Sequence, residues 1–154
     1  MNDYVSIWTD GACSVQKRCG GWAAILFYQG KKVSVSGMDL DTTNNRMELT
    51  AVIEGLRRLK KPFKVKIFTD SKLIVNAFRQ NWLDGWQRRD WKKADGSEVS
   101  NVDLWKSLLA MLKCKALTYT FVWVKGHAGL PLNEAVDKLA VAERDAALYK
   151  KRYV

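Results

Sequence analysis

A chain of 154 residues, 47% of them hydrophobic, is the size of one compact domain and can bury a core. No apolar run approaches the roughly 18 residues of a transmembrane helix, and residues 1–12 lack the pattern of a signal peptide. Three cysteines without C-x-x-C spacing and a single histidine argue against a zinc site. We therefore expect one domain over residues 1–154, in the cytoplasm and away from membranes, with reduced thiols, although Cys13 and Cys19 could pair under oxidation.

The net charge of +10 indicates which kind of molecule the protein could bind. A strongly basic protein favours an anionic partner such as nucleic acid. The same charge can also serve solubility alone, and only its distribution over the surface separates the two interpretations.

Hydrophobic periodicity predicts alternating strands and helices over most of the chain. In chain order, the expected elements are strands over 4–10, 22–28 and 31–38, a helix from the cap residues 42–45 to about 59 that Pro62 stops, a strand over 65–69, helices over 71–78 and 102–113, a strand over 118–124, and a helix over 133–149. The first three strands indicate an antiparallel meander, and the strand–helix–strand crossover indicates a parallel pair. These patterns predict an α/β fold with a mixed sheet.

Two strands are expected to end in Thr, Asp and a small residue. Asp10 follows an apolar run and precedes Gly11, which lets the backbone leave the sheet. Asp70 repeats the pattern before Ser71. One such Asp is usually a cap or turn residue, but two in one small domain favour a shared site at the carboxyl ends of the strands.

Two further acids flank apolar helix faces. Glu48 lies one turn before Val52, and Asp137 lies beside Val136. Each alone reads as a solvated helix-edge acid. If the strand ends and helix faces converge, four carboxylates meet in one cleft and need divalent cations to offset their repulsion. Oxygen ligands without thiolate or imidazole suit Mg²⁺, with Mn²⁺ as a substitute, and two such ions about 4 Å apart are the usual clamp for in-line phosphoryl displacement.

Four motifs carry a family resemblance. They are Thr9-Asp10-Gly11-Ala12-Cys13, Asn44-Asn45-Arg46-Met47-Glu48-Leu49, Thr69-Asp70-Ser71, and the run from Trp123 to Gly129 with Asn133, Glu134 and Asp137. In this order, over nearly the whole chain, they resemble bacterial-type ribonuclease HI of the type 1 ribonuclease H family. The resemblance implies a monomer with a five-stranded mixed sheet that hydrolyses the RNA strand of RNA–DNA hybrids with two Mg²⁺ ions, leaving 3′-hydroxyl and 5′-phosphate ends.

The resemblance also implies roles for five catalytic residues. Asp10, Glu48, Asp70 and Asp137 match the metal-binding carboxylates of the family. His127 matches its loop histidine, which is thought to aid proton transfer or product release. A lone histidine is usually an ordinary loop residue, but nearby glycines would let this one move toward the cleft.

Further positions match residues that hold the hybrid. Those near the cleft, in the phosphate pocket and in the DNA-binding channel are Cys13, Thr43, Asn44, Asn45, Lys72, Trp82, Trp86 and Asn101. Residues 79–100 resemble the family's basic protrusion, which grips the DNA strand. Some of these residues also have a purely structural interpretation: helix capping for Asn44, Asn45 and Asn101, and core packing for the tryptophans, including Trp91 and Trp105.

Some positions depart from the family pattern. Residues 14–19 lack its usual Gly/Pro-rich loop, and Lys72 stands where Gln is common. We expect Lys72 and Lys17 to replace some hydrogen bonding to base edges by attraction to phosphate. The basic end, residues 150–154, is expected to fray. Two alternatives remain: another nuclease or strand-transfer enzyme on the same fold, and a non-catalytic hybrid-binding module. The four intact carboxylates favour an enzyme.

Overall fold

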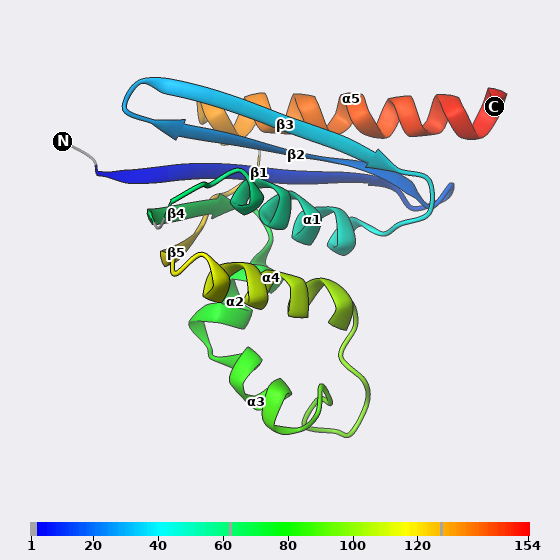
Figure 1. Ribbon diagram of the computed structural model, residues 1–154. Coiled ribbons are helices and arrows are strands. Elements are labelled where there is room, and N and C mark those ends of the chain that lie inside the picture. The colour runs from blue at the N-terminus through cyan, green and yellow to red at the C-terminus, as the bar shows by residue number, and fades with distance from the viewer. Residues whose placement is uncertain (1–2, 62, 127) are drawn as a thin grey trace.

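The computed structural model describes residues 3–61, 63–126 and 128–154, and within them one mixed sheet forms the centre (Figure 1). The strand order is β3-β2-β1-β4-β5. The strands are β1 (Tyr4–Ser14), β2 (Cys19–Tyr28), β3 (Lys31–Asp39), β4 (Lys64–Thr69) and β5 (Thr118–Trp123). β1, β2 and β3 pair antiparallel, whereas β4 pairs parallel to both β1 and β5. The predicted meander and the predicted parallel pair are both confirmed.

Helices cover both faces of this sheet (Figure 1). They are α1 (Asn44–Arg57), α2 (Lys72–Arg79), α3 (Trp82–Arg88), α4 (Val102–Cys114) and α5 (Pro131–Tyr153). α5 lies on one face, and α1, α2 and α4 lie on the other, where the larger core forms around Ile7, Leu56 and Trp105. A smaller core that includes Ile25 and Val136 fills the space under α5. Within the described residues, no helix combines the length and the apolar character needed to cross a membrane.

The first strand is longer than its sequence pattern predicts. β1 continues through Asp10 to Ser14 because β2 supplies a pairing partner along this stretch, with Asp10 opposite Ala23. On the other side, the pairing of β1 with β4 stops at Trp8, opposite Phe68. The expected turn after Asp10 is therefore wrong. Asp10 lies inside its own strand, just beyond the point where the neighbouring strand β4 ends.

The β1–β2 register also decides the question of a disulfide. Cys13 lies opposite Gly20, whereas Cys19 lies opposite Ser14. Neighbouring residues of a strand point to opposite faces of the sheet, so the two cysteine side chains lie on different faces. Both thiols are free in the structure.

Three local expectations are corrected by the structure. Residues 79–100 contain a short helix, α3, which was not among the predicted elements. It includes Gly85, and Asn81 before it makes no side-chain cap. Asn101 precedes α4 with a φ of 63° and makes no side-chain cap. The basic end does not fray, because α5 continues to Tyr153. Pro62, the expected helix stop, lies outside the described residues, and α1 already ends at Arg57.

Candidate active site

Asp10 lies in β1, paired with β2 on one side and beyond the last pair with β4 on the other. Its side chain is 5% exposed. The backbone N–H of Gly11 donates a hydrogen bond to its Oδ1 at 2.9 Å. Because β4 has already ended at this level, the carboxyl group borders an opening rather than another strand.

Glu48 comes from α1, which approaches β1 very closely. A Cβ atom placed on Gly11 would lie 2.7 Å from the backbone nitrogen of Glu48, so only glycine permits this distance. Thr43 helps to fix the start of α1, since its side chain accepts a hydrogen bond from the Arg46 N–H at 3.3 Å. Glu48 is 5% exposed, and its Oε2 is buried without a hydrogen-bond partner among the described residues. A buried carboxylate oxygen without a donor is costly unless a cation or proton reaches it.

Asp70 follows β4 directly and is held through its backbone. The Ser71 N–H donates to Thr69 Oγ1 at 3.0 Å, and Trp123 at the end of β5 donates its indole N–H to the Asp70 carbonyl oxygen at 3.1 Å. Thr9 Oγ1 ties β1 to β4 by donating to the Phe68 carbonyl oxygen at 3.2 Å. The three adjacent strand ends thus fix where the Asp70 carboxylate emerges.

The acids converge as the sequence suggested. Asp10, Glu48 and Asp70 each present a carboxylate oxygen, and these atoms lie within 4.8 Å of one another. Asp137, from α5, shares a hydrogen bond with Asp10. All four acids line one pocket of about 420 Å³. Two strands and two helices on opposite faces of the sheet therefore supply one acidic cluster.

This crowding changes the acidity of the two most buried members. Burial, repulsion by Asp70 and the hydrogen bond with Asp137 raise the pKa of Asp10 from 3.8 to about 8. Burial, together with the neighbouring Asp10 and Asp70, raises the pKa of Glu48 well above its ordinary value. In the absence of a cation, the cluster therefore retains protons that isolated acids would lose.

Three of the residues assigned to substrate binding border the same pocket. Asn44, Asn45 and Lys72 are exposed at its rim. The Lys72 ammonium lies 5.1 Å from the centre of the Trp123 ring, a cation–π contact. Two neutral amide side chains and one cation thus lie at the entrance of a strongly acidic pocket.

The remaining assigned residues that the structure describes lie outside the pocket lining. The Cys13 thiol is directed to the Thr42 carbonyl oxygen at 3.6 Å, and burial raises its pKa above the ordinary value. Asn101 Oδ1 accepts a hydrogen bond from Arg46 at 3.3 Å, so α1 and the start of α4 are joined near Thr43. His127 lies outside the described residues.

The two assigned tryptophans differ in exposure. Trp86 is buried, at 9% exposure, and packs edge-on against the fully buried Trp105 with ring centres 5.5 Å apart. Trp82 is partly exposed beside Trp86. The expected core role of Trp105 is confirmed, and Trp91 is partly buried against the same core. Trp86 belongs to that core as well, which leaves Trp82 as the more accessible ring.

Some functional positions carry no clear signal in the sequence. Arg46 forms an ion pair with Asp103 at 2.8 Å that links α1 to α4, although the two residues are 57 positions apart. Trp123 reaches Asp70 from another strand, and a Cβ atom on Gly126 would lie 3.1 Å from the Asp70 carboxylate. Arg46, Trp123 and Gly126 all lie within the four motifs that carry the family resemblance, and this was the only sign in the sequence of their roles.

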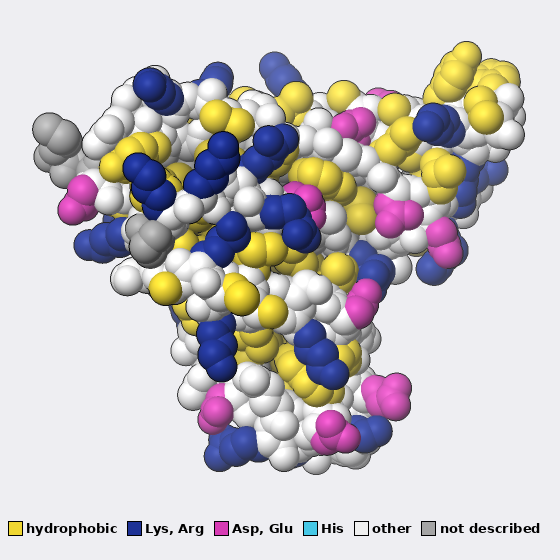
Figure 2. Space-filling model, viewed as in Figure 1, with side chains coloured by type: hydrophobic (Ala, Val, Ile, Leu, Met, Phe, Trp, Pro, Cys, Tyr) yellow, Lys and Arg dark blue, Asp and Glu magenta, His cyan; other side chains and the backbone are white. Residues whose placement is uncertain are grey.

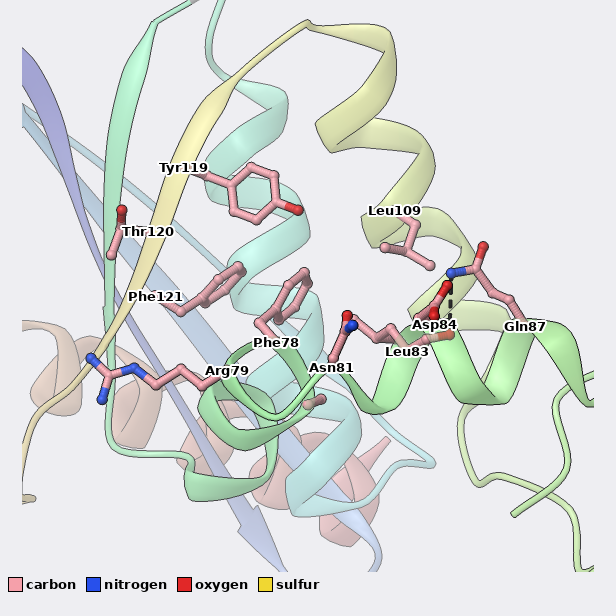
Figure 3. A pocket seen from close by; sticks show the side chains of 11 residues that line it. Phe78, Arg79, Asn81, Leu83, Asp84, Gln87, Leu109, Tyr119, Thr120 and Phe121 are labelled. Atoms are coloured by element: carbon pink, nitrogen blue, oxygen red, sulfur yellow. Dashed lines mark hydrogen bonds between the residues drawn. The ribbon is translucent and has the colours of Figure 1, made fainter. Parts of the chain in front are cut away.

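A second cavity, of about 440 Å³, lies between α2, α3, α4 and β5 (Figure 3). Its wall is aromatic: Phe78 stacks on Phe121 with ring centres 4.1 Å apart, and Tyr119 meets Phe78 edge-on. Among its described lining residues the one carboxylate is Asp84, which pairs with Arg88 at 3.1 Å. This cavity lacks the ligands that a divalent cation needs, so the acidic pocket is the better candidate for chemistry.

Comparison with known proteins identifies the family. A family model described as RNase H matches residues 2–145. The chain belongs to the ribonuclease H family. Ribonuclease H of Thermoanaerobacter sp. (strain X514) is 49% identical over 141 residues, which cover 92% of this chain and 90% of that relative. The chain is thus a nuclease of the hydrolase class, as its carboxylates indicated.

Solved ribonuclease H structures share the fold. LC9-RNase H1, described as a type 1 RNase H with the type 2 active-site motif, matches with a TM-score of 0.78 at 30% identity, over 96% of this chain and 74% of that chain. LC11-RNase H1, solved in complex with an RNA/DNA hybrid, matches with a TM-score of 0.73 at 20% identity, over 94% and 99%. The predicted ribonuclease H fold is confirmed.

Proposed function

We propose that this ribonuclease H hydrolyses the RNA strand of RNA–DNA hybrids, leaving 3′-hydroxyl and 5′-phosphate ends, with two divalent cations, Mg²⁺ or in its place Mn²⁺. The observation that carries the proposal is the cluster of Asp10, Glu48 and Asp70, whose carboxylate oxygens lie within 4.8 Å of one another. The hybrid in the LC11-RNase H1 structure supports the choice of substrate.

The residues of the pocket fit hard divalent cations. The donors are carboxylate oxygens, which Mg²⁺ and Mn²⁺ prefer. Glu48 Oε2 has no hydrogen-bond partner among the described residues and the pKa of Asp10 is raised, and both features indicate a site that lacks positive charge. We propose Asp10, Glu48, Asp70 and Asp137 as the ligands, with Asp10 central because it interacts with the other three.

The protein groups divide the remaining work. When bound, the cations supply activation of the attacking water and neutralisation of charge at the scissile phosphate. Asn44 and Asn45 have donors and acceptors suited to ribose hydroxyls and minor-groove edges, which distinguish RNA from DNA. We propose His127 for proton transfer or product release. Cys13 contributes its backbone rather than thiol chemistry.

We further propose that the DNA strand runs toward residues 79–100. We propose that Thr43 and Asn101, which both accept hydrogen bonds from Arg46, bind a phosphate group. Trp82, with Trp86 behind it, offers a ring to the DNA strand. The three free thiols agree with a reducing compartment, for which we propose the cytoplasm, and we propose that the enzyme acts as a monomer.

A substrate panel tests the proposal. Labelled RNA–DNA hybrid, duplex RNA and duplex DNA are incubated with the protein, with Mg²⁺, with Mn²⁺ and with chelator. We expect cleavage only of RNA in the hybrid, only with a metal ion, and products with 5′-phosphate ends. Cleavage of duplex DNA would instead indicate another nuclease on this fold, and hybrid binding without cleavage in either metal would indicate a binding module.

The Lys72→Gln variant tests the cation at the rim of the pocket. Because each phosphate contact releases about one counterion, removing it should reduce the salt slope of hybrid binding by about one unit. The measurement is the hybrid dissociation constant between low and moderate salt, in chelator. Lys31→Gln, an exposed lysine at the start of β3, is the control. An unchanged slope for Lys72→Gln refutes the phosphate contact.

The Trp123→Phe variant tests how Asp70 is positioned. Phe keeps a ring on β5 but removes the N–H that donates to the Asp70 carbonyl oxygen at 3.1 Å. A hydrogen bond of this kind is worth about 1 kcal/mol, so we expect kcat to fall roughly fivefold at saturating metal. Tyr119→Phe, on the same strand, should have no effect. Equal kcat values for both variants would remove Trp123 from the positioning of Asp70.

A further inference from the structure

The last turns of α5 form a surface that the family match does not cover. The ribonuclease H match ends at residue 145, whereas α5 continues to Tyr153. This stretch carries two tyrosines that are each 63% exposed, Tyr149 and Tyr153, with ring centres 4.9 Å apart. Exposed aromatic rings of this size have no role in either core.

The same stretch is attached to the β1–β2 turn. Lys151 donates a hydrogen bond from Nζ to the Lys17 carbonyl oxygen at 2.6 Å. A hollow of about 510 Å³ separates the two segments, and Lys17, Leu148, Lys151 and Arg152 line it. The turn and the helix end project together beyond the rest of the sheet (Figure 1). We call this unit the C-terminal arm, residues 15–18 and 146–154.

The C-terminal arm is basic as well as aromatic. It carries five cations, Lys17, Arg18, Lys150, Lys151 and Arg152. Arg18 pairs with Asp41 at 3.3 Å, and the other four make no ion pair with any described residue. Hydrophobic and basic side chains gather over the end of α5 in Figure 2. Cations that form no ion pair with the described residues, beside exposed rings, suit single-stranded nucleic acid, because phosphates bind the cations and bases stack on the rings.

The C-terminal arm is continuous with the proposed hybrid-binding face. The Arg18 carbonyl oxygen accepts a hydrogen bond from the Thr42 N–H at 2.8 Å. Thr42 precedes Thr43 and Asn44, which stand at the phosphate position and at the rim of the acidic pocket. In Figure 2 the end of α5 overhangs a recess that lies between it and the part of the molecule that contains α3 in Figure 1. The C-terminal arm therefore adjoins the proposed hybrid-binding face on this side.

We propose that the C-terminal arm binds a single-stranded stretch of nucleic acid that flanks the hybrid. The inference rests on the proposed function, because a flank has meaning only beside a bound hybrid. The bases of the flank stack on Tyr149 and Tyr153, and its phosphates lie near Lys150 and Arg152. Such contacts are tolerant of sequence.

Binding to blunt and flanked hybrids in chelator, where cleavage stops, separates the outcomes. Hybrids of one sequence carry no flank or about 10 unpaired nucleotides, as DNA or as RNA, at either end. We expect the wild type to bind at least one flanked form about 5- to 10-fold more tightly than the blunt form at ~0.1 M salt. Tyr149→Ala/Tyr153→Ala and Lys150→Gln/Arg152→Gln should each lose this gain and keep the blunt affinity. The control, Lys31→Gln/Lys32→Gln at the start of β3, removes the same charge and should keep the gain.

Three results would overturn the inference. Equal wild-type affinity for all flanked and blunt hybrids removes the arm from binding. Equal losses of the arm variants on both substrates would show only general attraction. Concentration-dependent dimers in sedimentation, abolished by Tyr149→Ala/Tyr153→Ala, would make the rings a contact between copies of this chain. Failure of the proposed function looks different, because the wild type would then not cleave blunt hybrid in Mg²⁺.

Discussion

Replacing Asp10 by Asn is expected to abolish turnover while hybrid binding survives. Asp10 interacts with each of the other three acids of the pocket, so its loss should weaken the hold on both cations. Cation stabilisation of the reacting phosphate is worth several kcal/mol, which corresponds to a fall in kcat of at least about 10³-fold. The measurement is single-turnover cleavage of hybrid in Mg²⁺, with affinity measured separately in chelator. Turnover equal to wild type would remove Asp10 from the metal site.

The same substitution should stabilise the metal-free protein. The unfolded Asp10 carboxyl loses its proton near pH 3.8, whereas the folded one loses it near pH 8. Between these values the folded state binds more protons, so the free energy of unfolding falls as pH rises. Asn carries no charge and removes this loss. We expect the gain in stability from Asp10→Asn to be small at pH 4.5 and to reach a few kcal/mol at pH 8, since one pKa unit is about 1.4 kcal/mol.

Urea unfolding in chelator at several pH values measures this difference. Asp90→Asn, which removes an exposed acid of residues 79–100, serves as the matched control and should show no such growth with pH. Mg²⁺ or Mn²⁺ should stabilise the wild type more at pH 8 than at pH 5.5, because bound cations offset the repulsion between the acids. If Asp10→Asn and wild type lose stability in parallel as pH rises, ionisation of Asp10 is not the cause of the loss.

Much of this site could be predicted from the order of the motifs, and the limits have physical causes. Two strand ends and two apolar helix faces indicate which acids meet, because a mixed sheet brings neighbouring strand ends together. The end of the first strand was predicted too early, because pairing with β2 outweighs the turn propensity of Asp10-Gly11. The Arg46–Asp103 pair could not be predicted, because only tertiary packing joins positions so far apart.

The helix in residues 79–100 shows a different limit. α3 has seven residues, includes Gly85 and starts after Asn81 in a left-handed conformation without a side-chain cap. Asp84 in its first turn and Arg88 in its last turn are helix signals, but Gly85 between them weakens the pattern. The helix is held instead by packing, with Leu83 and Trp86 buried against the core. The tryptophans of residues 79–100, which the sequence suggested as exposed contacts for nucleic acid, therefore also pack against the core.

Gly11→Ala is expected to damage both folding and turnover. The added methyl would lie 2.7 Å from the Glu48 backbone nitrogen and 2.8 Å from the Met47 carbonyl carbon. These are backbone atoms of α1 and cannot rotate away, so the helix must move outward from β1. Overpacking of this kind costs about 1–3 kcal/mol. Because Glu48 moves with the helix, its carboxylate should separate from Asp10.

A displacement of about 1 Å in a catalytic group can lower turnover by about 100-fold, so we expect the folded Gly11→Ala enzyme to lose at least about tenfold in kcat. Gly85→Ala is the matched control. Its nearest neighbour would be the flexible guanidinium of Arg89 at 3.2 Å, and Ala favours the helix by about 1 kcal/mol. Its stability should hold or rise and its turnover should not change. A Gly11→Ala protein that is less stable but turns over normally would show that the close approach of α1 serves packing alone. A lower kcat in the fully folded fraction, with a higher metal concentration needed for half-maximal activity, would show that the absence of a side chain at Gly11 sets the distance between Asp10 and Glu48.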